Sequence, residues 1–149
     1  MPRAVDANGK RRLDTALWRK VENYLDARRI LATRLRVLGP RYEELRLQAR
    51  VWLKRAYRGG LDELRAKLLK AVRQLVDPLS GGTDGSGWQL GQVFHVSEVY
   101  YLMARLPEVE SISTVMVRRA DDTNWQESVN IDARSYPFFA DEAVELTAS

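Results

Sequence analysis

The sequence predicts an α+β fold in which a mostly antiparallel sheet carries helices on one face. Residues 13–28 and 61–76 repeat apolar side chains at helical spacing. Residues 43–54 alternate apolar and polar side chains, and residues 109–118 are rich in β-branched ones, as is typical of strands. Hydrophobic residues make up 45% of the 149 residues and charged residues 30%, which is enough apolar material for a packed core.

Two elements are expected before residue 40. The helix predicted over residues 13–28 has a narrow apolar stripe, formed by Leu13, Leu17, Val21, Tyr24 and Leu25. A stripe this narrow indicates packing on one neighbour or docking onto a partner. Residues 30–38 alternate between an apolar face and a face with two arginines, which predicts a strand ending at Gly39-Pro40.

The strand over residues 43–54 has the clearest pattern in the chain. Its expected buried face consists of Leu45, Leu47, Ala49, Val51 and Leu53. The opposite face consists of Arg46, Gln48, Arg50, Trp52 and Lys54. The helix over residues 61–76 follows, with two acidic residues in its first turn and Pro78 just beyond its end.

The second half continues with shorter elements. Residues 92–96 predict a short strand, Ser97 is expected to cap a helix over 98–106, and Pro107 ends that helix. After the strand over 109–118, residues 127–132 are expected to pair as a hairpin partner and 143–147 as an edge strand. The expected organisation is an N-terminal helix (1–29), an α+β domain (30–120) and an irregular tail (121–149).

The net charge of +4 hides a strong asymmetry between the halves. Residues 1–75 hold 20 Lys/Arg, 15 of them Arg, against 8 Asp/Glu, whereas residues 76–149 hold 4 against 12. A chain with one half at +12 and the other at −8 can bind nucleic acid through its basic half. It can equally bind a complementary copy of itself, or a neighbouring protein, head to tail.

The residues give little support for catalysis. The chain has no cysteine, which excludes disulfides, thiol nucleophiles and Cys-ligated metals, and it has a single histidine, His95. The glycine-rich segment 81–91 lacks the Lys of a phosphate loop, the preceding strand of a dinucleotide site and the carboxylates of a calcium loop. We therefore predict no enzyme activity, no cofactor and no metal, and a hydrolase using His95 and Ser97 stays only a formal alternative.

One set of residues is a candidate interface. If the strands over 30–38 and 43–54 lie side by side, their outer faces form a basic strip with one aromatic residue. The predicted partner-facing strip consists of Arg34, Arg36, Arg46, Arg50 and Trp52. A nucleic acid is the alternative ligand for this strip, although RNA-binding sheets carry two or three aromatic residues and this one carries one.

The segment Asp77–Met103 carries an ordered motif: Pro-Leu-Ser-Gly-Gly-x-Asp-Gly-x-Gly-Trp, a further Gly, a short hydrophobic strand and Ser-Glu-x-Tyr opening a helix. Its loop residues are Pro78, Gly81, Gly82, Asp84, Gly85, Gly87, Trp88, Gly91, Ser97 and Tyr100. This segment resembles the C-terminal region of baseplate J-like proteins, the wedge subunits of contractile phage tails and related injection systems. Upstream, Tyr-Leu-Asp-x-Arg-Arg, a Gly-Pro turn and a strand of alternating Arg and apolar residues are also similar, so the resemblance covers about residues 15–118. Members of that family are normally much longer than this chain.

The resemblance implies a structural protein that is made in the cytoplasm and built into a tail or tail-like particle. It implies partners among other wedge and hub proteins, further copies of the chain included, and no membrane or small-molecule substrate. A nucleic-acid-binding module that uses the basic N-terminal half is the alternative function. Trp88 is expected to anchor the glycine-rich loop to the core.

Overall fold

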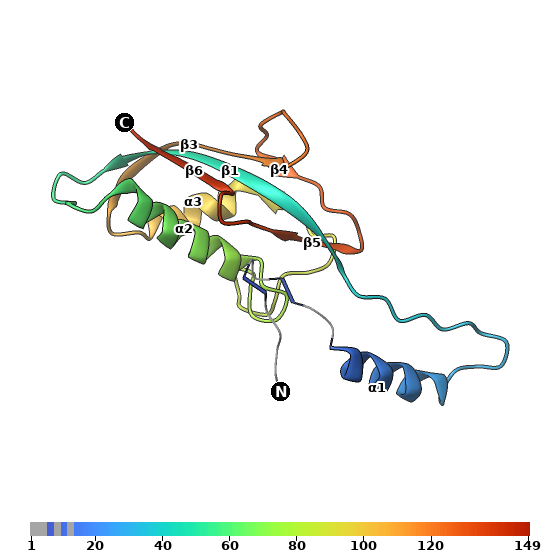
Figure 1. Ribbon diagram of the computed structural model, residues 1–149. Helices are drawn as coiled ribbons and strands as arrows, with labels where there is room; N and C mark the ends of the chain where they lie inside the picture. The colour runs from blue at the N-terminus through green and yellow to red at the C-terminus, as the bar shows by residue number, and fades with distance from the viewer. Residues whose placement is uncertain (1–5, 8–9, 12–13) are drawn as a thin grey trace.

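The computed structural model describes residues 6–7, 10–11 and 14–149. In this part of the chain the helices are α1 (Thr15–Asp26), α2 (Leu61–Leu75) and α3 (Val96–Ala104). The strands are β1 (Arg41–Leu53), β2 (Phe94–His95), β3 (Val109–Arg119), β4 (Ser128–Val129), β5 (Ser135–Phe138) and β6 (Val144–Ala148). The elements form the α+β fold that the sequence predicts (Figure 1).

β1 is the central strand of the main sheet. β3 pairs antiparallel along one side of it, from Leu45 opposite Arg119 to Leu53 opposite Val109. Along the other side lie two parallel strands in succession, β5 against Arg41–Glu44 and β6 against Leu47–Val51. β2 and β4 form a separate antiparallel pair. The long strand predicted at 43–54 thus organises the sheet, although the sheet is mixed rather than uniformly antiparallel.

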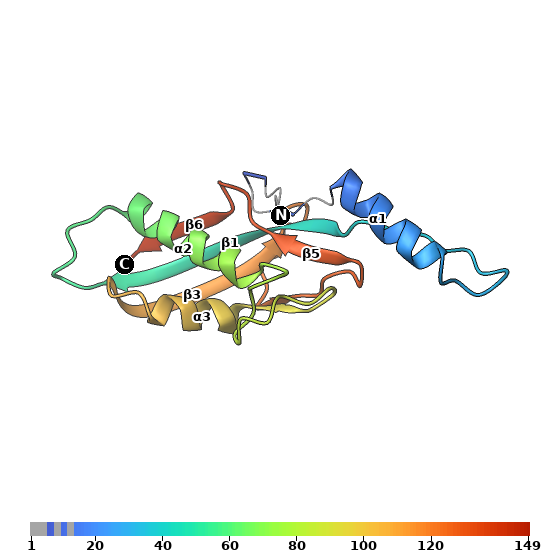
Figure 2. The ribbon, with the colours of Figure 1, turned by 90° about the horizontal axis from the view of Figure 1, so that it is seen from below.

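Both α2 and α3 cover the same face of the sheet, as expected (Figure 2). The alternation of β1 places four residues on that face, and each is at most 1% exposed: Leu45, Leu47, Ala49 and Val51. The apolar stripe of α2 packs there through Leu64, Leu68, Val72 and Leu75, and that of α3 through Val96, Val99 and Met103. Burial of these side chains against one another is the main stabilising term of the fold.

The strand predicted over residues 30–38 is wrong. These residues form no strand, and the chain from 33 to 40 runs as an extended segment into β1 (Figure 1). The alternating pattern is present, but β1 already has β3 on one side and β5 and β6 on the other. No strand position beside β1 is left for it.

The helix boundaries shift slightly from those predicted. α1 begins at Thr15, where the side chain of Asp14 accepts a hydrogen bond from Ala16 N, and Leu13 lies outside the described residues. α3 begins two residues early, so Ser97 lies inside the helix and its predicted capping role is wrong. His95 precedes the helix without a side-chain cap.

The segment after residue 120 contributes more to the fold than its irregular sequence suggests. The predicted hairpin partner is the short strand β4, which pairs with β2, and the predicted edge strand is β6. β5 was not expected, and neither was the complete burial of Phe139 and Ala143 beside it. Much of this segment is therefore part of the sheet and core.

Residues 14–40 form an arm that projects from the body of the molecule (Figures 1 and 2). α1 leads outward, and residues 27–40 return to β1. No residue of α1 is buried. The arm holds a series of exposed large hydrophobic side chains: Leu17, Tyr24, Leu25, Ile30, Leu31, Leu35 and Leu38. Of the described residues in the narrow stripe of the helix, Leu17, Tyr24 and Leu25 are thus exposed and Val21 is half-buried.

Candidate partner-binding surface and glycine-rich loop

The structure separates the residues of the predicted basic strip into two groups. Arg34 and Arg36 lie on the arm, whereas Arg46, Arg50 and Trp52 lie along β1, on the face opposite the helices. Because residues 30–38 do not pair with β1, the two groups do not form one surface. The continuous strip predicted from two neighbouring strands is therefore wrong, and any partner would meet these groups separately.

The β1 group differs in how far each side chain is engaged within the chain. The Arg46 guanidinium lies 2.9 Å from a Glu44 carboxylate oxygen and 3.3 Å from a Glu142 one. Trp52 is 52% exposed. Arg50 is exposed and, with Gln48 and Thr147 beside it, lines a shallow hollow of about 170 Å³ on the outer face. Arg50 and Trp52 are thus the members of this group that are open to solvent.

The glycine-rich loop is folded around Asp77, which follows α2. One carboxylate oxygen of Asp77 accepts hydrogen bonds from Leu79 N (2.8 Å) and Ser80 N (3.0 Å). The backbone carbonyl of Asp77 accepts two more, from Gly81 N and Trp88 N. A single residue therefore closes both the entry to the loop and its return.

The glycines of the loop meet two separate requirements. Gly82, Gly85, Gly87 and Gly91 have φ between +68° and +107°, a region that side chains disfavour. At Gly87, a Cβ would also lie 2.4 Å from the carbonyl oxygen of Pro78, closer than packed atoms approach. Asp84 supports the exposed end, where its carboxylate accepts hydrogen bonds from the Ser86 amide and hydroxyl.

Trp88 anchors the loop, as predicted. It is 2% exposed, and the centroid of its ring lies 5.8 Å from the ring centroid of Phe94. The ring centroids of Phe94 and Phe139 lie 5.5 Å apart. Of the remaining motif residues, Tyr100 packs against the core and Ser97 is exposed on α3. The motif thus builds a rigid connection between α2 and α3.

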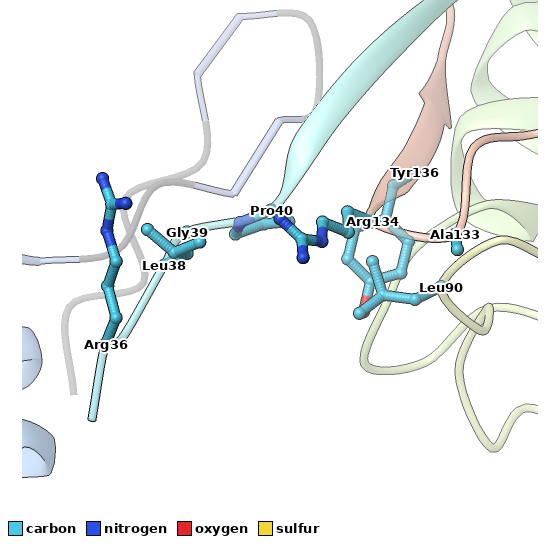
Figure 3. A pocket seen from close by; sticks show the side chains of 8 residues that line it. All are labelled: Arg36, Leu38, Gly39, Pro40, Leu90, Ala133, Arg134 and Tyr136. Atoms are coloured by element: carbon cyan, nitrogen blue, oxygen red, sulfur yellow. The ribbon is translucent and has the colours of Figure 1, made fainter. Parts of the chain in front are cut away.

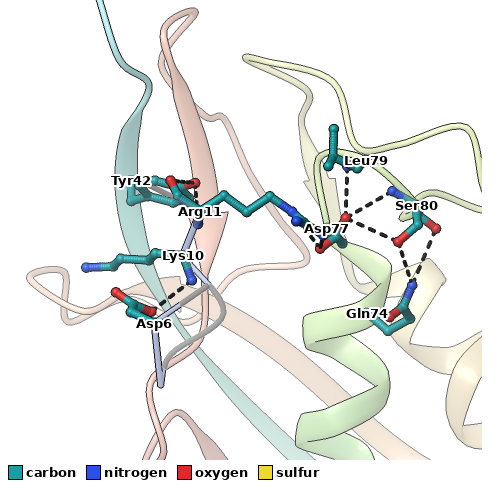
Figure 4. Close-up of polar contacts among 8 residues, drawn as sticks. All are labelled: Asp6, Lys10, Arg11, Tyr42, Gln74, Asp77, Leu79 and Ser80. Carbon is teal, nitrogen blue, oxygen red and sulfur yellow. Dashed lines mark hydrogen bonds and ion pairs between the residues drawn. The ribbon is translucent and has the colours of Figure 1, made fainter. Parts of the chain in front are cut away.

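A contact that the sequence did not indicate ties the N-terminal segment to this loop (Figure 4). Arg11 Nη2 lies 2.8 Å from the Asp77 carboxylate, and its Nε donates to the same oxygen. The Tyr42 hydroxyl both accepts from Arg11 N and donates to Arg11 O, each at 2.9 Å. No local pattern marks an ion pair between residues 66 positions apart, so only the folded structure reveals it.

The surroundings of these groups shift their pKa values in opposite directions. Partial burial acts to raise the pKa of Asp77, but the hydrogen bonds from Leu79 N, Arg11 and Ser80 N outweigh it and lower that pKa. Burial of the Tyr42 hydroxyl raises its pKa, partly offset by its hydrogen bond to Arg11. At neutral pH, Asp77 is therefore an ionised acceptor for Arg11.

A second hollow lies where the arm joins the body (Figure 3). It has a volume of about 440 Å³ and lies between Leu38 and Pro40 of the arm and Leu90 and Tyr136 of the body. Arg36 and Arg134 stand at its polar rim. Its mixed lining and open position suit contact with a protein surface more than enclosure of a small molecule.

The residues of the formal hydrolase alternative do not form a nucleophile–base pair. His95 and Ser97 are both exposed, and no hydrogen bond joins them in the described structure. Beside them, burial raises the pKa of Glu98, and His95 only partly offsets this. Across the residues that the structure describes, no group of three or more potential metal ligands gathers, and no helix is long and apolar enough to cross a membrane.

The chain matches no family model, and no curated protein matches it.

Proposed function

We propose that the chain is a structural component of the baseplate wedge of a contractile tail or injection system. It acts by protein–protein assembly and catalyses no reaction. The observation that carries this proposal is the ordered motif from Pro78 to Tyr100, which resembles the corresponding region of baseplate J-like proteins.

Two features of the structure support this proposal. Several motif residues have a defined mechanical role in the loop, since Asp77 closes it, Gly87 allows a close backbone approach and Trp88 fixes it to the core. A motif with these roles serves a rigid connection, as an assembly subunit requires. The arm also presents exposed apolar side chains that suit burial against another protein.

The partners proposed are other wedge and hub proteins, together with further copies of this chain, in a particle assembled after synthesis in the cytoplasm. The test is to purify contractile particles from the organism that encodes the chain, and to search them by mass spectrometry and cryo-electron microscopy. We expect the chain in the baseplate in several symmetric copies. Its absence from intact particles would overturn the proposal.

Binding of nucleic acid by the basic half is the alternative, and the exposure of Arg34, Arg36 and Arg50 favours it. Anisotropy titrations of labelled duplex and single-stranded DNA at several salt concentrations separate the two functions. Phosphate binding would weaken steeply with added salt, regardless of base sequence. For an assembly subunit we expect no such binding at physiological ionic strength.

A further inference from the structure

The extended part of the arm has the sequence of a strand but none of a strand's hydrogen bonds. Residues 34–40 make no backbone hydrogen bond with the described residues. Their pattern still alternates, with Leu35 and Val37 on one face and Arg34 and Arg36 on the other. Exposed backbone in an extended conformation, with alternating side chains, can add to the edge of a sheet.

β6 offers a short free edge of the sheet. Leu47 N donates to Ala143 O and Ser149 N to Val51 O, so the odd-numbered residues of this strand direct their backbone groups toward β1. Since directions alternate along a strand, the N–H and C=O groups of Val144, Leu146 and Ala148 point away from β1. None of these outward groups has a partner among the described residues, but Val144 is only 2% exposed, so the open part of the edge consists of Leu146 and Ala148.

The charges of the two segments are complementary. From Arg28 to Arg41 the chain holds five arginines and no acidic residue. From Asp141 to Glu145 it holds three acidic residues and no basic one, and because Asp141 pairs with Arg73 and Glu142 with Arg46, Glu145 is the carboxylate left for the arm. Glu145 is exposed and has no ion pair in the described structure, which leaves it free to face an arginine.

The other sheet edges suit the arm less well. The edge of β3 is already bridged where Val117 and Gln126 exchange backbone hydrogen bonds, and the strand ends in Arg118 and Arg119, which would repel a basic segment. The Ser135 carbonyl of β5 accepts from Gly91 N. Among the described edges, β6 is thus the one that is both open and acidic.

The arm cannot reach β6 of its own chain. Residues 34–40 continue directly into β1, and β6 first pairs at Leu47. At about 3.3 Å per residue, the eleven positions from Arg36 to Leu47 span roughly 36 Å of extended chain. The arm and β6 lie toward opposite ends of the molecule (Figure 1), so each copy presents one of each to its neighbours.

We propose that residues 34–38 of one copy add as a strand to the free edge of β6 of a second copy. Arg34 and Arg36 then lie on the outer face with Glu145, and Leu35 and Val37 extend the apolar face beside Leu146 and α2. The contact is head to tail, so it closes into a ring or continues as a filament. The inference rests on the arm and β6 alone and does not require the proposed function.

The test begins with the oligomeric state of the full chain, measured by sedimentation velocity over a range of concentrations. We expect assembly that grows with concentration. Replacing both arm arginines (Arg34→Glu with Arg36→Glu) should weaken it at least tenfold, because like charges would then face each other. Glu145→Arg should also weaken assembly at least tenfold, because an arginine on the edge would then face the arginines of the arm.

A mixture of these two variants is the sharpest measurement. Neither variant should assemble alone, but the mixture should. In the mixture, the glutamate arm of one variant meets the arginine edge of the other, and the arginine arm of the second meets the glutamate edge of the first. Leu35→Pro should also prevent assembly, because proline removes a backbone donor that the single copy does not use. The matched control, Arg19→Glu with Lys20→Glu on α1, changes the charge equally and should assemble normally.

Hydrogen exchange identifies the edge itself. On assembly, the amides of Leu146 and Ala148 should become protected, while those along the outer edge of β3 should not. A chain that stays monomeric up to roughly 100 µM would overturn the proposal. So would assembly that survives Leu35→Pro, or a mixture that fails to rescue the two charge variants.

Discussion

The glycine-rich loop and the extended segment of the arm both lack regular secondary structure, and they differ in almost every physical respect. The glycine-rich loop over residues 77–93 is closed by hydrogen bonds to Asp77 and fixed to the core by Trp88. The extended segment of the arm has exposed apolar side chains, and its backbone from 34 to 40 has no hydrogen-bond partner in the described structure. Irregular backbone is thus rigid where its N–H and C=O groups are hydrogen-bonded within the chain, and it is free to pair with another chain where they are not.

The largest expected effect is on the anchor of the loop. Trp88→Ala should lower the free energy of unfolding by roughly 3–5 kcal/mol, because it empties a buried site against Phe94. Urea denaturation followed by circular dichroism measures this change. The control is Trp52→Ala, which removes the same side chain from a half-exposed position on β1. Equal losses for the two variants would contradict the anchoring role.

A smaller loss is expected from the backbone of the loop. Gly87→Ala combines a positive φ with a Cβ 2.4 Å from the Pro78 carbonyl oxygen. The matched variant, Gly85→Ala, has a similar backbone requirement (φ +73°) but open space around the added methyl group. We expect about 1–2 kcal/mol for Gly85→Ala from strain alone, and a larger loss for Gly87→Ala. Thermal and urea denaturation of the pair would show no difference if the close approach were absent.

The ion pair of Asp77 makes the stability of the loop depend on pH. Because the folded-state pKa of Asp77 is lowered, its contribution is present above the unfolded-state pKa and is lost as pH falls through the folded-state value. Asp77→Asn should cost about 1–3 kcal/mol at neutral pH, since the amide carries no charge and loses the ion pair with Arg11. The difference between wild type and variant should shrink in acid. A difference independent of pH would contradict an ionised Asp77.

Glu98 should show the opposite dependence. Burial raises its folded-state pKa, so its stabilising contribution is present below the unfolded-state pKa and is lost as pH rises through the folded-state value. Glu98→Gln should therefore leave stability unchanged in acid and raise it at neutral pH, by no more than about 1 kcal/mol. Denaturant titrations at two pH values measure this, and destabilisation at neutral pH would show that the carboxylate has a stabilising partner.

The contrast between loop and arm also explains how much the sequence could predict. β1, α2 and β3 were predicted within two residues because their patterns repeat over ten or more positions. Trp88 was predicted as an anchor because a large aromatic residue among glycines has few other uses. These are local signals, and they stay valid whatever lies nearby.

The failures have a common physical cause in pairing between distant segments. Residues 30–38 have a strand pattern, but a strand also needs a free neighbour, and β5 and β6 occupy that side of β1. The basic strip failed with it, because it assumed that strands over 30–38 and 43–54 lie side by side. β5 and the Arg11–Asp77 ion pair were missed for the same reason, since their partners lie far away in the sequence.

The smallest expected effect on stability tests the other half of the comparison. Leu35→Ala and Leu31→Ala should change the free energy of unfolding by no more than about 0.5 kcal/mol, because both side chains are already exposed in the single copy. Denaturation must be measured at a concentration where the chain is monomeric, since assembly would add stability by mass action. If either variant were destabilised as much as Trp88→Ala, the arm would be packed on the body of its own chain. It could then not pair with β6 of a second copy. A neutral result, together with weaker assembly at high concentration, would mean that the apolar residues of the arm serve the interface and not the fold.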